Sequence, residues 1–458
     1  MLEKLFKLKA NNTNVKTEVM AGITTFMTMA YILAVNPSIL ADAGMDSTAV
    51  LLATCLASFL ATACMALMSN MPFALSAGMG LNAYFAYTVV LTMGYSWQIA
   101  LLAVFAEGII FIILSLTKVR EAIFNCIPLD LKHGVSVGIG LFIAFIGLQN
   151  AGLAVNNDST LVSIVVFKDN FSTSGICALL AVIGTLITAI LHIKKVKGSI
   201  LIGIVATWVL GIICQVTGLY QVTPEAGFYS LIPAFQMTDF SKLDETLGQC
   251  FKADFSTIKP FEFIVVIFAF LFVDLFDTLG TVIGVSAKAD MLDENGKLPK
   301  IRPVLLADSI GTTAGAVLGT STVTTFVESS AGVAAGGKTG LTAMTTAILF
   351  LVSTLFAPIF TAIPSFATAP ALIIVGFLMF SNIAQLKLDE KNYTSVIPAY
   401  LAIIAMPLFY SISEGIAIGI ISYVVINLVC NIGKKDKVKI SPLLYILAVL
   451  FICKYIFL

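Results

Sequence analysis

The sequence consists largely of apolar runs about as long as a lipid bilayer is thick. A helix needs about 20 consecutive apolar residues to cross the hydrocarbon core. The chain holds one such run after another, for example 49–68 and 341–363. These runs are continuous rather than alternating, which favours helices over the strands of a membrane β-barrel. Only 11% of the residues are charged, against about 25% in soluble domains. We therefore expect an all-α polytopic membrane protein.

Apolar length marks fourteen predicted membrane segments. The third and the tenth are irregular, because glycine and small polar residues interrupt them, and we expect short extended stretches there. A further apolar stretch, 442–458, either spans the membrane or lies at its interface. The fourteen segments are 19–40, 49–68, 73–91, 98–116, 135–152, 175–193, 199–216, 261–285, 303–318, 319–336, 341–363, 367–384, 396–410 and 415–430.

The basic residues predict how these segments are oriented. With the N-terminus in the cytoplasm, 21 of the 26 Lys and Arg residues fall in cytoplasmic segments and 4 in outside loops. The last, Lys454, lies in the C-terminal stretch. An excess of Lys and Arg inside is the usual signature of membrane topology. Residues 1–18 are polar and basic, without the features of a cleavable signal peptide. We predict a multi-pass plasma membrane protein with residues 1–18 in the cytoplasm.

Fourteen segments divide into two groups of seven, and an odd number inverts the second group relative to the first. The predicted repeats are 19–220 and 261–431, joined by an extracellular loop, 221–260. A basic loop and the last apolar segment follow in 432–458. The irregular segment is the third of each repeat. Paired, glycine-interrupted segments at matching positions are a pointer to the binding site of a transporter.

The eighth segment carries carboxylates inside its apolar run. Asp274, Asp277, Thr278 and Thr281 are spaced i, i+3, i+4 and i+7, which places them on one face of a helix. A charge at the membrane centre costs about 3 kcal/mol on insertion scales. The polar stripe should therefore face a cavity and serve a substrate or a proton. The alternative is a structural pair that hydrogen-bonds to neighbouring helices.

Two further polar residues lie at the irregular segments, Asn82 in the third and Glu328 in the tenth. In inverted repeats these two would meet near the midplane, with Asp274 or Asp277 beside them. One amide and two carboxylates suit a neutral, flat ligand with several N–H donors and a carbonyl, such as a nucleobase. A buried aspartate can also carry a proton, so proton-coupled uptake is a hypothesis. Alternatively, Asn82 bridges helices and Glu328 caps a short helix.

Other functional classes find less support in the sequence. The eight Cys lie mostly in apolar runs and form no CxxC pair, so we expect no metal site and no cofactor. The composition of an integral membrane protein also gives no reason to expect a nucleic-acid partner. An intramembrane aspartyl protease would need its two Asp on two helices and a Gly-x-Gly-Asp element, and both are missing. We therefore do not expect an enzyme.

Three stretches resemble the adenine–guanine–hypoxanthine permeases, the azaguanine-resistance-type branch of the nucleobase–cation symporter-2 family. They begin at Gly80-Leu-Asn82, Phe276-Asp277-Thr and Val327-Glu328-Ser. The resemblance implies a core domain of 19–117 plus 261–363 and a gate domain of 132–220 plus 364–431. It also implies purine:proton symport by an elevator-like motion, in a homodimer joined through the gate.

The same resemblance implies a set of site residues. Asn82, Asp274 and Glu328 would contact the substrate, and Asp277 would support substrate or proton binding. The Gln-His pair of the xanthine–uric acid branch is missing from segment three, so we expect guanine, hypoxanthine or adenine. Uracil transport, or anion transport on the same fold, is the alternative. Further residues expected to line the pocket are Gly78, Thr278, Thr281, Phe326 and Ser329.

Overall fold

The computed structural model is mostly helical. It describes residues 2–117, 127–168, 170–233, 237–254, 256, 259–288, 291, 298–432 and 438–457. Within that part of the chain, ten helical stretches are long and apolar enough to cross a membrane. The irregular third and tenth segments, the carboxylate-bearing eighth and the shorter thirteenth complete the fourteen predicted segments.

The first half of the chain runs from a short helix, α1 (Leu2–Phe6), to the end of α10. The first predicted segment is two helices interrupted at Ala30 and Tyr31. The third is a strand, then a short helix, then a π-helical stretch, η3. The elements are α2 (Val15–Met29), α3 (Ile32–Asp42), α4 (Ser47–Cys64), β1 (Leu75–Ala77), α5 (Met79–Ala83), η3 (Tyr84–Thr92), α6 (Trp97–Leu116), α8 (Leu129–Asn150), α9 (Ile176–Ile193) and α10 (Ser199–Val216).

The second half repeats this order, with a strand and a short helix in its third segment. Its elements are α11 (Pro260–Lys288), α12 (Ile301–Leu318), β4 (Val323–Thr325), α13 (Ser329–Ala334), α14 (Gly340–Ser353), α15 (Ala357–Thr361), α16 (Ser365–Phe380), α17 (Tyr393–Leu408), α18 (Ile412–Cys430) and α19 (Pro442–Phe457). A small hairpin, β2 (Ala154–Asn157) with β3 (Leu161–Ile164), lies outside this plan. The last helix, α19, packs on α18.

The two irregular segments meet as strands inside the protein. β1 pairs antiparallel with β4, with Ser76 opposite Thr324, and all six strand residues are buried. One further bond extends the ladder at each end, from Gly78 N to Thr322 O (3.0 Å) and from Phe326 N to Ala74 O (3.0 Å). Extended backbone at membrane depth is tolerated where protein covers it and satisfies its polar groups. The predicted extended stretches are therefore confirmed, and their backbone polar groups hydrogen-bond to each other.

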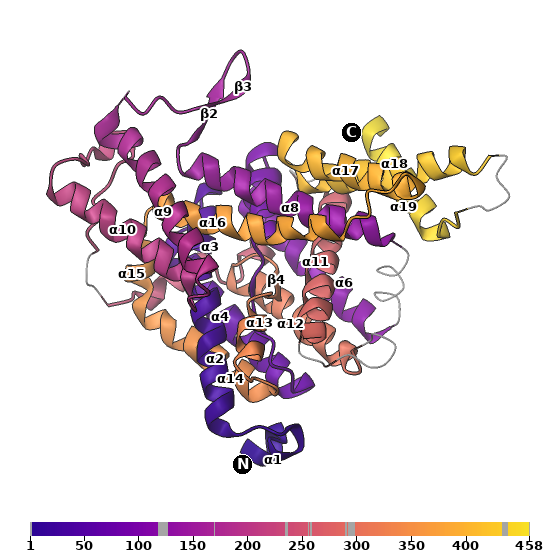
Figure 1. The fold of residues 1–458 in the computed structure, drawn as a ribbon, viewed down its shortest axis with the longest axis horizontal. Coiled ribbons are helices and arrows are strands. Elements are labelled where there is room, and N and C mark those ends of the chain that lie inside the picture. Colours follow the sequence, from indigo (N-terminus) through magenta and orange to yellow (C-terminus); the bar gives the residue numbers. More distant parts are fainter. Residues whose placement is uncertain are drawn as a thin grey trace.

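The helices pack in two groups that draw on both halves of the chain. In the first, α12 packs on α4 and α6, and α14 packs on α2 and α4. In the second, α8 packs on α16 and α17, and α16 also packs on α9 and α10. Figure 1 shows α8, α16 and α17 in one layer, with α2, α4, α12 and α14 below it in the view.

Small residues allow the closest helix approach in the second group. A Cβ atom on Gly140 of α8 would lie 2.6 Å from the carbonyl oxygen of Gly376 of α16, and one on Gly376 would lie 2.5 Å from Gly140 O. Real side chains do not come so near. Membrane helices use small residues in this way, because close backbone packing replaces the hydrophobic effect that lipid removes.

In the first group, a buried carboxylate ties the beginning of α2 to the beginning of α14. Glu18 is fully buried and accepts hydrogen bonds from Thr339 Oγ1 (2.8 Å) and Thr342 Oγ1 (2.7 Å). The backbone N–H groups of Lys338 (3.0 Å) and Thr339 (3.2 Å) also donate to it. A buried charge is stable only when it is paired or hydrogen-bonded in this way.

Candidate functional site

The tenth segment is the centre of a polar network inside the helical bundle. Its hydroxyl-rich run, Gly319 to Thr325, is buried throughout. Side chains of this segment contact four other segments: Asn82 in the third, Glu107 in the fourth, Asp277 in the eighth and Tyr31 in the first. Segment ten, which carries Glu328, thus also contacts Asn82 and Asp277, whereas Asp274 does not take part in these contacts.

Asn82 lies in α5, directly after the strand pair. It is fully buried, and Ser321 Oγ donates a hydrogen bond to its Oδ1. Its Nδ2 has no acceptor among the described residues. A buried N–H group without a partner is costly, so the amide of Asn82 is a donor that a bound ligand would satisfy.

Glu328 precedes α13 and is held from segment one. Tyr31 OH donates to Glu328 Oε1 at 2.7 Å, and Thr28 Oγ1 lies 3.5 Å from Glu328 O. Tyr31 is 1% exposed, and its ring lies 6.4 Å from that of Phe326. The Tyr31 bond thus orients the Glu328 carboxylate through one of its oxygens. A carboxylate has several acceptor sites, so the group can accept further hydrogen bonds from a ligand.

The two aspartates of α11 have different surroundings. Asp277 is partly exposed, and its Oδ2 accepts a hydrogen bond from Thr324 Oγ1 of β4 at 3.1 Å. A Cβ on Gly78, at the other strand, would lie 3.5 Å from the same oxygen and would collide with the Thr324 side chain. Asp277 therefore contacts the place where β1 pairs with β4, which we call the strand crossing, and glycine at position 78 leaves room for its carboxylate.

Asp274 instead faces α12. It is fully buried, and Thr278 Oγ1 lies 2.8 Å from its Oδ1 and 3.0 Å from Oδ1 of Asp308, which is also fully buried. A hydroxyl has one hydrogen. Both contacts can therefore be hydrogen bonds only when one of the two carboxyl groups carries a proton. This arrangement suits a group that takes up and releases a proton.

The other residues predicted to line the pocket are buried close to this network. Ser329 Oγ accepts a hydrogen bond from Ala74 N (3.0 Å) and so joins the start of α13 to the start of β1. Phe326 and Thr281 are each 6% exposed. Ser329 thus has a structural role in positioning the strands, and Phe326 packs beside Tyr31.

Sequence reasoning missed four of the residues that build this network. Tyr31, Ser321, Thr324 and Asp308 each touch a predicted site residue. The hydroxyl-rich run of segment ten was a visible signal for two of them. No signal in the sequence pairs Tyr31 with Glu328, because 297 positions separate them.

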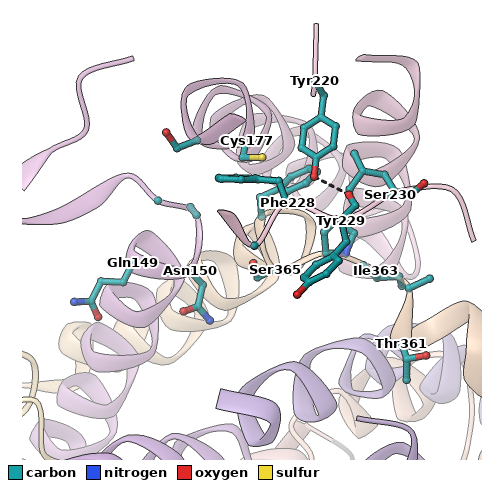
Figure 2. Close-up of a pocket in the computed structure, with 18 residues that line it drawn as sticks. Gln149, Asn150, Cys177, Tyr220, Phe228, Tyr229, Ser230, Thr361, Ile363 and Ser365 are labelled. Atoms are coloured by element: carbon teal, nitrogen blue, oxygen red, sulfur yellow. Dashed lines mark hydrogen bonds between the residues drawn. The ribbon is translucent and has the colours of Figure 1, made fainter. Parts of the chain in front are cut away.

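A large cavity lies elsewhere in the molecule. It measures about 560 Å³ and is lined by the end of α8, the starts of α9 and α16, the connector before α16 and part of the 217–260 loop. Figure 2 shows Asn150, Tyr229 and Ser365 around it. None of the sequence-predicted site residues lines this cavity.

Membrane helices packed around two broken segments that pair with each other are the architecture of many multi-pass membrane transporters. The transmembrane domain of a cyanobacterial bicarbonate transporter, BicA, has the same fold. It aligns with a TM-score of 0.60 at 16% identity, over 89% of this chain and 97% of that one. The predicted fold of two inverted seven-segment repeats is thus confirmed.

The sequence comparisons identify the family. A family model described as "Permease family" matches residues 16–443, and the chain belongs to that family. It is 44% identical to the guanine/hypoxanthine permease PbuO of Bacillus subtilis, over 98% of each chain. It is 40% identical to the adenine permease AdeP of Escherichia coli, over 100% of this chain and 96% of that one. The resemblance to the adenine–guanine–hypoxanthine permeases is confirmed.

Proposed function

We propose that this protein takes up purine nucleobases (guanine, hypoxanthine or adenine) across the plasma membrane, coupled to protons. The observation that carries the proposal is the polar site at the crossing of β1 and β4. It offers an unpartnered amide donor on Asn82 and acceptors on Glu328 and Asp277. The names of the full-length relatives support the same substrate class.

The donor and acceptor pattern fits a purine edge. Two adjacent N–H groups of a purine can bond one carboxylate, which is a strong and directional pairing. The Glu328 carboxylate, which Tyr31 orients through Oε1, would accept such a bond. The Asn82 amide can then donate to a ring nitrogen or a carbonyl oxygen. The fold neighbours include anion transporters, but two carboxylates beside the crossing disfavour an anionic substrate here.

The geometry favours exchanging the roles that the sequence assigned to the two aspartates. Asp277 contacts the strand crossing, so we place it at the substrate. Asp274 shares the Thr278 hydroxyl with Asp308 inside the bundle, so we place the coupled proton on this pair. A proton there and a purine at the crossing would both be held by α11, which offers a direct route for coupling.

The transport motion that we propose is an elevator-like movement of a core domain against a gate domain. The core would hold 19–117 plus 261–363, and the gate 132–220 plus 364–431. The two packing groups of helices support this division. We also propose a cytoplasmic N-terminus, which places the 217–260 loop outside the cell, and a homodimer joined through the gate.

The test is uptake of radiolabelled hypoxanthine by cells that lack their own purine carriers. We expect uptake that a protonophore abolishes and that unlabelled guanine or adenine inhibits. Xanthine and uracil should not compete. Absence of purine uptake, in cells shown to hold the protein in their membrane, would overturn the proposal. Inhibition by uracil alone would favour the uracil alternative.

A further inference from the structure

The large cavity has a place in the fold that bears on transport. Its walls include Asn150 at the end of α8 and the connector from Thr361 to Ser365, which joins α15 to α16. In the proposed division, that connector joins core to gate. Asn150 Nδ2 also lies 3.4 Å from the hydroxyl of Tyr87 in segment three. The cavity therefore lies where the two proposed domains meet, on the proposed extracellular side.

The walls of the cavity are fixed by hydrogen bonds rather than formed by a loose loop. Tyr220 OH donates to Tyr229 O at 2.8 Å, as Figure 2 shows. Two side chains of α10 hydrogen-bond to the backbone of Leu231. Its N–H donates to Gln215 Oε1 at 2.7 Å, and Trp208 Nε1 donates to its carbonyl at 2.9 Å. A preformed site binds a ligand at lower entropic cost than one that must order itself.

The chemistry of the lining selects the kind of ligand. Of the described residues that line the cavity, none carries a charge. Aromatic rings are present in Tyr220, Phe228, Tyr229 and Phe366, together with amide and hydroxyl groups such as Asn150. Aromatic faces suit flat rings, and amides both donate and accept hydrogen bonds. The volume of about 560 Å³ is in the usual range for small-molecule sites.

We propose that this cavity, the outer pocket, is a second binding site for a neutral nucleobase, occupied on the extracellular side before the central site. The inference rests on the proposed function, because that function supplies the ligand class. An uncharged, aromatic and amide-lined wall would accept a neutral purine and reject an anionic one. The outer pocket would raise the local concentration of substrate beside the domain boundary.

The test is equilibrium binding of radiolabelled hypoxanthine to the purified full-length protein. We expect two sites in the wild type, the second at least about tenfold weaker than the first. Glu328→Gln should remove the tight site and keep the weak one. Adding Phe228→Ala should then remove the weak site.

The matched control is Phe251→Ala in the same Glu328→Gln background. Phe251 lies on the same loop as Phe228, but its ring packs on that of Phe105, with 5.0 Å between the ring centres. It should keep the weak site.

The outcomes separate the outer pocket from the central site. If Glu328→Gln binds no hypoxanthine, or if Phe228→Ala leaves the weak site intact, the outer pocket is not a purine site. If the wild type shows the weak site alone, the central site fails and the outer pocket stands. Anionic urate provides the ligand control. Binding of urate to the weak site, as tightly as hypoxanthine, would overturn the assignment to neutral bases.

Discussion

The hydroxyl of Tyr31 donates a hydrogen bond to Oε1 of Glu328, 2.7 Å away, and so fixes one oxygen of that carboxylate. Tyr31 lies at the interruption between α2 and α3, while Glu328 precedes α13. The bond therefore connects the first segment of one repeat to the broken segment of the other. In the proposed site, it would determine how the carboxylate faces the substrate.

Removing the Tyr31 hydroxyl should weaken purine binding. A hydrogen bond to a charged group contributes roughly 1.5–3 kcal/mol, so Tyr31→Phe should raise the dissociation constant for hypoxanthine by about tenfold or more. Equilibrium binding to purified protein measures the change. Tyr95→Phe is the matched control. The Tyr95 hydroxyl donates to Glu262 over a distance of 2.6 Å, and neither residue contacts the strand crossing. Equal losses in both variants would contradict a positioning role for Tyr31.

Neutralising Glu328 should stop transport without unfolding the protein. Glu328→Gln keeps the size of the side chain, and its amide oxygen can still accept the Tyr31 bond. It removes the negative charge that would accept hydrogen bonds from purine N–H groups. We expect purine uptake to fall to background, while a surface-labelling assay finds normal amounts in the membrane. Wild-type uptake by this variant would remove Glu328 from the site.

Asp308→Asn should uncouple transport from the proton. The substituted amide can donate permanently to Thr278, and so imitates the protonated carboxyl group beside Asp274. We expect hypoxanthine exchange across vesicles to persist, while accumulation against a gradient disappears. Exchange and accumulation assays on the same vesicles measure both. Glu262→Gln is the control, because this carboxylate accepts hydrogen bonds from Tyr95 and Lys259 and takes no part in the contacts of Thr278 with the two aspartates. Protonophore-sensitive accumulation by Asp308→Asn would place the proton elsewhere.

Enlarging Gly140 should destabilise the packing of α8 on α16. A methyl group there would lie 2.6 Å from Gly376 O, and overpacking typically costs about 1–3 kcal/mol. Gly140→Ala should therefore lower the melting temperature of the detergent-solubilised protein. Leu148→Ala, on an exposed position of the same helix, should leave it nearly unchanged. A melting temperature for Gly140→Ala equal to that of the wild type would show that the helices can separate freely at this point.

Much of the architecture could be predicted, because apolar length and glycine placement act locally along the chain. The eighth segment was expected at 261–285, and α11 spans Pro260–Lys288. The extended stretches in segments three and ten were also expected. The uncertain C-terminal stretch forms α19, whose Phe451 ring lies 6.2 Å from that of Phe268 in α11. Lys434, Lys435 and Lys437 of the predicted basic loop lie outside the described residues.

The partners of the site residues could not be predicted in the same way. Spacing places Asp274 and Asp277 on one helical face, but a shift of three residues turns the carboxylates toward different neighbours. Only the packed structure shows that Asp277 meets β4 and that Asp274 meets α12. The contact between Tyr31 and Glu328 likewise depends on how two distant segments cross. The polar residues of the proposed site could therefore be named from the sequence, but not their individual partners.

The pairing of β1 with β4 has a consequence for how such a protein can be divided. Each half of the chain contributes one strand, and a strand of three residues finds its partner only in the other half. A half-length chain would expose unpaired backbone within the membrane, where each such group costs several kcal/mol. A single ancestral repeat would thus have needed a second copy of itself, inserted in the opposite orientation. Duplication and fusion would make that pairing obligatory within one polypeptide.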